Sequence, residues 1–212
     1  MTKENREPNT AGCAEEFFET VAAFSLCTDP AERERLDAGI WERYGTSGFV
    51  LISDMSGFSS TTRSYGICYF LGMIHRARQL LAPIIQANNG LLLKCEADNC
   101  YTFFEHADDV LQACIELNSR LAIVNGESTG EKKIHLSIGV DYGKLLLVGQ
   151  HDYFGDPVNT ASKLGEDLAG QGETLVTNRA LERATKTHDV NSEQLVTRIS
   201  GIDIKYMRLK VD

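Results

Sequence analysis

The sequence has no apolar run of membrane-spanning length, no excess of basic residues and no pair of cysteines at metal-binding spacing. A membrane-spanning helix needs roughly 20 consecutive apolar residues, and no run in the 212-residue chain approaches that length. The formal net charge is −9, whereas surfaces that bind nucleic acid or anionic membranes need a basic footprint. The composition therefore predicts a protein without nucleic-acid or membrane partners.

A targeting segment and a disulfide framework are also missing. Residues 1–7 lack the apolar core of a signal peptide, which predicts a cytoplasmic location. The six cysteines form no CxxC pair, and none has a histidine at zinc spacing. Cys95 and Cys100 flank Asp98, but a disulfide between them is disfavoured in a reducing compartment.

What remains is typical of a globular domain, with 42% hydrophobic and 24% charged residues. The length suffices for one well-cored domain with an extension. Residues 1–45 are predicted to form that N-terminal extension, with a polar start and helices at 15–27 and 30–44, because Pro30 suits a helix start and Gly45 a helix end. Residues 46–212 are predicted to form the main domain.

The main domain begins with a predicted strand that ends in an acidic residue. Residues 49–52 are an unbroken apolar run, typical of a strand buried on both faces. Asp54 follows, and Ser56 and Gly57 predict a sharp turn. A carboxylate followed by the free N–H groups of a turn can hold a metal ion with a phosphate beside it. A purely structural role for Asp54 as a turn-former is the alternative.

Helical and strand patterns alternate along the rest of the chain. Helices are predicted at 67–88, 106–125, 158–168 and 178–184, a polar loop at 59–63, a hairpin at 90–94 and 100–104, and further strands at 134–140, 144–148, 173–177, 195–199 and 204–210. Asp98 lies near the hairpin turn. This order predicts an α+β sandwich in which helices cover one side of a single sheet.

Three segments then point to a known family. Residues 51–59 combine the strand, Asp54 and the glycine turn; residues 90–98 place Lys94 four residues before Asp98; and residues 152–163 read Asp-Tyr-Phe-Gly-Asp-Pro-Val-Asn-Thr-Ala-Ser-Lys. Together, and in this order, they resemble the catalytic domain of the class III nucleotide cyclases, the family of adenylyl and guanylyl cyclases, closest to the bacterial homodimeric adenylyl type. The resemblance implies a ferredoxin-like βααββαβ sandwich with extra C-terminal strands and an N-terminal helical extension.

The resemblance also implies a two-metal site. Asp54 and Asp98, helped by the backbone carbonyl of Met55, would hold two Mg²⁺ or Mn²⁺ ions per site, since these ions prefer hard oxygen ligands. One ion would activate the ribose 3′-hydroxyl and the other would neutralise the triphosphate. Phosphate oxygens would be held by the N–H groups of Gly57, Phe58 and Ser59.

The remaining roles implied by the resemblance concern the substrate. Lys94 and Asp152 would read adenine, because a lysine donor and an aspartate acceptor fit its N1 and its 6-amino group. Asn159 would orient the ribose, and Lys163 would meet charge on the α-phosphate from the next helical turn. In this family the metal-binding residues and the asparagine come from different subunits. The chain is therefore expected to bind ATP as a homodimer with two sites.

The match departs from the family pattern at several positions. Lys163 replaces an arginine and loses its bidentate grip on phosphate, while Glu96 and Ala97 replace an apolar residue and a glycine before Asp98. The family's second triphosphate-binding lysine is not clearly present. The alternatives are therefore a degenerate cyclase-homology domain that binds nucleotide and dimerises without turnover, and a guanylyl cyclase, which the pair of Lys94 and Asp152 disfavours. The N-terminal helices are open to an unknown regulator.

Overall fold

The computed structural model describes residues 14–128, 133–186 and 194–209, and only the backbone of residues 58–61. Its elements, in chain order, are α1 (Ala14–Leu26), α2 (Pro30–Tyr44), β1 (Gly45–Met55), α3 (Phe58–Tyr65), α4 (Ile67–Ala87), β2 (Leu91–Glu96), β3 (Asn99–Phe104), α5 (Ala107–Gly126), β4 (Leu136–Val148), β5 (Asp152–Phe154), α6 (Asp156–Ser162), a π-helix (Lys163–Leu168), β6 (Thr174–Thr177), α7 (Asn178–Leu181), β7 (Leu195–Ile199) and β8 (Ile202–Arg208). No described helix is long and apolar enough to cross a membrane.

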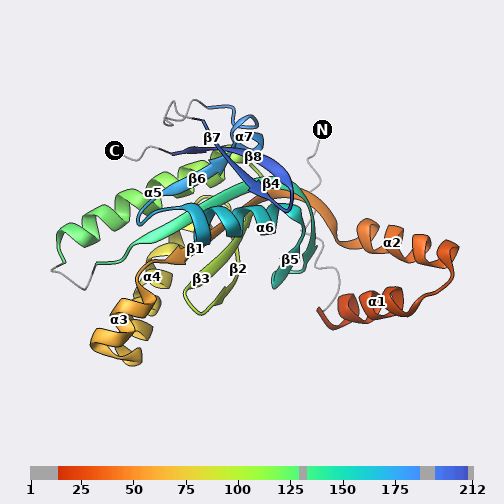
Figure 1. The fold of residues 1–212 in the computed structure, drawn as a ribbon, viewed down its shortest axis with the longest axis horizontal. Helices are drawn as coiled ribbons and strands as arrows, with labels where there is room; N and C mark the ends of the chain where they lie inside the picture. The colour runs from red at the N-terminus through yellow and green to blue at the C-terminus, as the bar shows by residue number, and fades with distance from the viewer. Residues whose placement is uncertain (1–13, 129–132, 187–193, 210–212) are drawn as a thin grey trace, which may run out of the picture.

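One eight-stranded sheet organises the chain (Figure 1). Its order is β2-β3-β1-β4-β6-β8-β7, and β5 pairs with β4 outside this path. All pairs are antiparallel except β4 with β6. The predicted α+β fold, with the hairpin and the extra C-terminal strands, is confirmed.

Strand β1 lies between β3 and β4 in the sheet and is buried on both faces over residues 48–53, as its apolar run predicts. Successive side chains of a strand point to opposite faces. Phe49 and Leu51 belong to the core beneath α4 and α5, whereas Val50 and Ile52 belong to a second core that includes Ala161 of α6. Both faces of β1 therefore exclude water, and its C-terminal end delivers Asp54 to the sheet edge.

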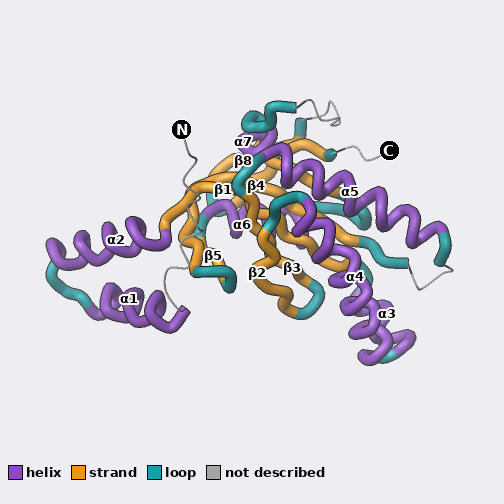
Figure 2. Tube along the Cα trace, turned by 180° about the vertical axis from the view of Figure 1, so that it is seen from behind, coloured by secondary structure: helices purple, strands orange, loops and turns teal. Residues whose placement is uncertain are grey.

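Helices cover both faces of this sheet, so the prediction of helices on one side only is wrong. Figure 2 shows α4 and α5 on one face, and Figure 1 shows α6 on the other. The close seating of α6 depends on two glycines. A Cβ on Gly139 of β4 would lie 2.0 Å from the carbonyl oxygen of Ala161 and 2.6 Å from the nitrogen of Gly165. Only glycine allows this approach of helix backbone to sheet.

Three local predictions are corrected by the structure. Residues 59–63, expected as a polar loop, lie in α3, which begins after Gly57 in a left-handed conformation at φ 98°. The strands expected at 134–140 and 144–148 form one strand, β4, because its register with β1 continues through Gly143 opposite Gly48. The helix expected at 158–168 begins at Asp156 and changes to a π-helix at Lys163.

The N-terminal extension contains the two expected helices, which project from the sheet as an antiparallel pair (Figure 1). The ring of Phe17 in α1 stacks on Phe154 of β5, with ring centroids 5.5 Å apart. Phe17 also packs with Tyr44 and Val148 in a small core of its own. The extension is thus attached to the end of the sheet that carries β5.

Candidate active site

Asp54 and Asp98 lie at the same end of the sheet because β1 and β3 are paired strands. Ser53, next to Asp54, lies opposite Cys100, two residues after Asp98. Burial, followed by the negative charges of Asp98 and Glu166, raises the pKa of Asp54 to about 6, although the N–H of Met55 partly offsets this. The structure therefore brings the two predicted metal ligands close enough for their charges to interact.

Glu166 is a third carboxylate at this site, and sequence reasoning missed it. It lies on the π-helix, where its Oε1 accepts hydrogen bonds from Asn99 Nδ2 at 3.1 Å and from Ser162 Oγ at 2.7 Å. Asn99 directly follows Asp98. The Glu166 side chain therefore ties the hairpin turn to α6. Nothing local in the sequence marks it, since an acidic pair on a helix usually faces solvent.

The carboxylates suit a magnesium or manganese ion that also binds a substrate. Among the described residues, no group of three or more His, Cys, Asp or Glu side chains is arranged to hold a metal ion by itself. Mg²⁺ is commonly bound by one or two carboxylates together with substrate phosphates. Burial and then the neighbouring negative charges raise the pKa of Asp54, and a bound cation would favour its ionised form. Two aspartates and a backbone carbonyl thus fit a metal that is completed by a phosphate ligand.

The turn after β1 is held firmly in place. The N–H of Ser56 donates to the carbonyl of His135 at 3.1 Å, and its hydroxyl lies 3.0 Å from that of Ser137. Gly57 takes the left-handed conformation that precedes α3. The side chains of Phe58 and Ser59 lie outside the described residues. Phosphate binding by this segment remains a prediction, now placed at the N-terminal end of a helix.

Lys94 of β2 and Asp152 of β5 form an ion pair, with Nζ and Oδ2 2.9 Å apart. Lys94 also lies 3.2 Å from Glu96 and 5.0 Å from the ring centroid of Tyr101. Burial lowers the pKa of Lys94, but hydrogen bonds to Asp152 and Glu96 outweigh this, so the pKa is raised overall. Both side chains are about three-quarters buried, at 26% and 27% exposed. The two residues predicted to read the base are therefore adjacent and charged.

Asn159 and Lys163 lie one turn apart and are both exposed. The Lys163 ammonium makes an i,i+4 ion pair with Asp167 on the same helical segment. This contact, together with the charge of Asp167, raises the pKa of Lys163. Lys163 is a full positive charge at the surface, partly neutralised within its own helix.

A buried ion pair positions α6, and the sequence analysis did not identify it. Asp141 of β4 is completely buried and accepts hydrogen bonds from Thr177 Oγ1 at 2.6 Å and from Arg179 Nε at 2.7 Å. Arg179 also donates to Asp156, the first residue of α6, at 2.8 Å. The hydrogen bond to Asp141 raises the pKa of Arg179. Burial of the guanidinium lowers this pKa, and the hydrogen bond to Asp156 raises it further. An acid inside the apolar pattern of β4 was the available signal, because such a group needs a partner.

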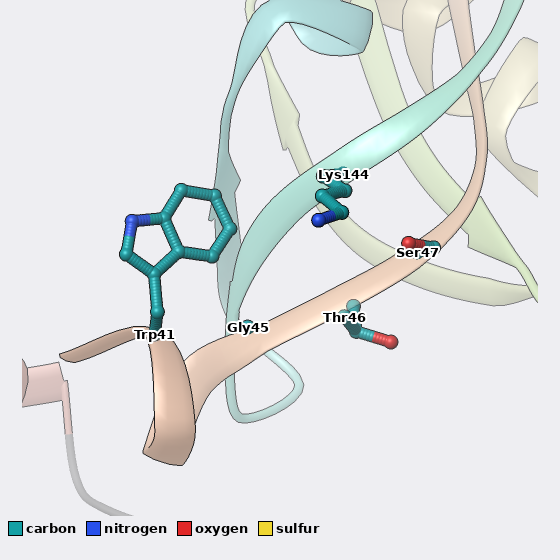
Figure 3. Close-up of a pocket in the computed structure, with 5 residues that line it drawn as sticks. All are labelled: Trp41, Gly45, Thr46, Ser47 and Lys144. Carbon is teal, nitrogen blue, oxygen red and sulfur yellow. The ribbon is translucent and has the colours of Figure 1, made fainter. Parts of the chain in front are cut away.

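A hollow in the surface of the described residues does not coincide with the candidate site. It has a volume of about 590 Å³ and is lined by Trp41, Gly45, Thr46, Ser47 and Lys144 (Figure 3). It lies at the start of β1, whereas Asp54 lies at the opposite end of that strand, about 30 Å away at the usual rise per residue. The candidate site therefore rests on the chemistry of its side chains and not on this hollow.

Comparisons with known proteins agree with this assignment of the fold. No protein-family model matches the sequence. A Rhizobium meliloti (strain 1021) protein named "Putative adenylate cyclase 3" is 25% identical over 129 residues, which are 61% of this chain and 22% of that protein. The chain therefore spans about a fifth of this curated relative.

Solved structures match over a larger part of the chain. The guanylyl cyclase Cya2 superposes with a TM-score of 0.69 at 19% identity, covering 79% of this chain and 93% of that one. An adenylate/guanylate cyclase/hydrolase from Silicibacter pomeroyi superposes with a TM-score of 0.67 at 21% identity, covering 79% and 98%. The expected resemblance is confirmed: the chain is similar in sequence to "Putative adenylate cyclase 3" and has the fold of the catalytic domain of class III nucleotide cyclases.

Proposed function

We propose that this chain is an adenylyl cyclase that converts ATP to 3′,5′-cyclic AMP and pyrophosphate at the interface of a homodimer. The observation that carries the proposal is the ion pair of Lys94 and Asp152, which offers a hydrogen-bond donor and an acceptor side by side. The name of the curated relative supports the same substrate. The fold alone is compatible with either purine nucleotide, so this pair of residues decides the choice.

The pair can read adenine without breaking its own contact. The Lys94 ammonium has three donors, of which Asp152 and Glu96 use two, leaving one for adenine N1. Each carboxylate oxygen of Asp152 accepts one bond, from Lys94 or from the N–H of Tyr153, and retains a lone pair for the 6-amino group. Guanine presents the reversed pattern, so its N1–H and O6 would meet like groups and leave them unpaired.

The carboxylates and α6 supply the rest of the mechanism. Mg²⁺ or Mn²⁺ at Asp54, Asp98 and the Met55 carbonyl would lower the pKa of the ribose 3′-hydroxyl and neutralise the triphosphate. The 3′-oxygen attacks the α-phosphorus in line, and the bond to pyrophosphate breaks. Asn159 holds the ribose in the attacking orientation, and the charge of Lys163 stabilises the α-phosphate oxygens.

The exposure of these residues is compatible with a homodimer. Asn159 and Lys163 are exposed on α6 and on the π-helix, where a second subunit can place its Asp54 and Asp98 against them. Two equivalent sites result from the two-fold symmetry of such a dimer. Each site would then combine the metal-binding carboxylates of one chain with the nucleotide-binding residues of the other.

The alternative is a dimerising homology domain that binds nucleotide without turnover. The observation that favours it is the engagement of Lys163 by Asp167, since this position should face the α-phosphate. Replacing Lys163 by arginine distinguishes the two. A live enzyme should gain up to about 100-fold in kcat, the size of effect that a transition-state donor has in other enzymes, whereas a domain without turnover should gain nothing.

The decisive test is cyclic AMP formation from ATP with saturating Mn²⁺, comparing the wild type with Asp54→Ala. Asp203→Ala is a matched control, because that carboxylate is exposed and forms a surface ion pair with Arg198, far along the chain from Asp54. Product that is lost in Asp54→Ala and kept in the control would establish the cyclase. Metal-dependent nucleotide binding without product would move the chain to the alternative, and loss of binding as well would refute the site.

A further inference from the structure

Two cysteines face each other directly behind the candidate site. Cys95 of β2 lies opposite Cys100 of β3, and the next pair, Glu96 and Asn99, closes a two-residue turn. In such a hairpin the pair that flanks the turn exchanges backbone hydrogen bonds, and the following pair does not. Non-hydrogen-bonded pairs have their Cα atoms about 4.5 Å apart, which lies within the range that a disulfide spans.

The thiols of this pair are reduced and lie on adjacent strands. Both cysteines are free, and they are opposite each other in the strand register. The interaction with Cys100, opposed by burial and helped by the charge of Arg78, lowers the pKa of Cys95 to about 7. Arg78 reaches the same turn from α4, donating to the carbonyls of Cys95 and Ala97. A thiol beside a guanidinium is the kind that oxidants attack.

The other described cysteines are placed differently. Cys114 is completely buried in the core, Cys68 is exposed at the start of α4, and Cys27 lies between α1 and α2. Cys95 and Cys100 lie on the face of the hairpin that packs against the core beneath α4. On the same hairpin, Lys94 contacts Asp152 of β5, and Asn99 contacts Glu166 of the π-helix. A change at the thiols therefore acts on the candidate site from behind.

We propose that Cys95 and Cys100 form a reversible thiol–disulfide couple that hydrogen peroxide oxidises. The Cys95 thiolate attacks one peroxide oxygen, the O–O bond breaks and hydroxide leaves, giving a sulfenic acid. The Cys100 sulfur then attacks the Cys95 sulfur, its proton passes to the departing hydroxyl, and water leaves. Overall, two thiols and one peroxide give one disulfide and two waters; a dithiol reverses the reaction.

The disulfide changes the hairpin that carries Lys94 and Asp98. An S–S bond of about 2.05 Å is much shorter than a contact between two thiols, so the two side chains must rotate toward each other, and the bond then restrains the two strands and the turn between them. Asp98 is two residues from Cys100, and Lys94 adjoins Cys95. The oxidised protein should therefore bind metal and nucleotide less well, because the restrained hairpin adjusts less to them. Only this last consequence rests on the proposed function; the disulfide itself does not.

The bond is tested on the whole chain by peroxide treatment and mass spectrometry. Digestion with trypsin and a protease that cuts before aspartate puts Cys95 and Cys100 in separate peptides, 95–97 and 98–107, with Cys114 in neither. The expected result is a loss of two hydrogens from the intact protein and a linked pair of these peptides, reversed by dithiothreitol. Cys95→Ser and Cys100→Ser should abolish the linked pair, and the control Cys68→Ser should keep it. Oxidation confined to other cysteines would overturn the proposal.

The consequence is tested by comparing reduced and oxidised protein for cyclic AMP formation and Mn²⁺-dependent nucleotide binding. We expect oxidation to lower the rate at least several-fold, with recovery in dithiothreitol and no response in Cys95→Ser, which lacks the thiolate that peroxide attacks. A linked pair with unchanged rate and binding would overturn the coupling to the site. The two proposals can also fail separately. If the disulfide forms and weakens Mn²⁺-dependent nucleotide binding, but the reduced protein makes no cyclic AMP, the thiol–disulfide couple is supported and the proposed enzyme activity is refuted.

Discussion

Glu166 on the π-helix accepts a 3.1 Å hydrogen bond from Asn99, the neighbour of Asp98. This contact joins the two parts of the chain on which the proposed mechanism depends, the hairpin that carries Asp98 and the helix of Asn159. It also adds a negative charge close to Asp54. Glu166 is thus a positioning residue whose charge and hydrogen bonds can be separated experimentally.

Glu166→Gln should lower the pKa of Asp54 while keeping the tether to Asn99, because the amide oxygen still accepts a hydrogen bond. Mn²⁺ needs the ionised carboxylate, so wild-type affinity should fall as the pH drops through about 6. In the variant this midpoint should move to lower pH. Calorimetric Mn²⁺ titrations between pH 5 and 8 measure it, with the exposed Glu182→Gln as control. An unmoved midpoint would mean that Glu166 does not act on Asp54.

Asp54→Asn should stabilise the metal-free protein at neutral pH. Since the pKa of Asp54 is raised from 3.8 to about 6 in the folded chain, the native state binds the proton more tightly and loses stability as the pH rises toward 6. The advantage of the variant should therefore grow from pH 4.5 to about 6.5 and then level off. For a half-exposed group we expect on the order of 1 kcal/mol, or about 2–4 °C in Tm. A pH-independent difference in thermal melts would contradict this.

Asp152→Asn should reduce the preference for ATP over GTP. The amide can turn its NH₂ toward guanine O6, and Lys94 loses one of its two carboxylate partners and keeps Glu96. We expect kcat/KM for ATP to fall by roughly 10- to 100-fold, about 1.4–3 kcal/mol, with a smaller loss for GTP. A competition assay with both nucleotides measures the ratio. Lys144→Met, which removes a charge from the hollow near Trp41, should leave the ratio unchanged. An equal loss for both nucleotides would show that Asp152 does not read the base.

Arg179→Met should destabilise the fold because it leaves the completely buried carboxylate of Asp141 without its cation. Removing one partner of such a pair costs about 3 kcal/mol, or roughly 6–12 °C in Tm. The double variant Asp141→Asn/Arg179→Met should recover most of this loss. Arg198→Met breaks an exposed pair with Asp203 and should cost under about 0.5 kcal/mol. Equal melting shifts in the two single variants would refute the distinction.

Short-range patterns were sufficient to predict most elements. The apolar run of β1, the hairpin around Asp98 and the helix at α5 were expected within a few residues, because alternation and helical spacing report local burial. The helix α3 was missed, since a run of serine and threonine residues favours turns over helices in isolation. The two halves of β4 were not joined, because only pairing with β1 carries the strand through Gly143.

The sequence by itself determined the order of the elements and the residue types of the site: Asp54, Lys94, Asp98, Asp152 and Asn159 are all visible as motif positions. Only the tertiary structure decided which distant groups meet. Glu166 reaches Asn99 across 67 positions and Arg179 reaches Asp141 across 38, and both contacts depend on α6 lying on the second face of the sheet. Local spacing reports how a segment folds, whereas charge and hydrogen-bond partners are set by packing between segments that no short window contains.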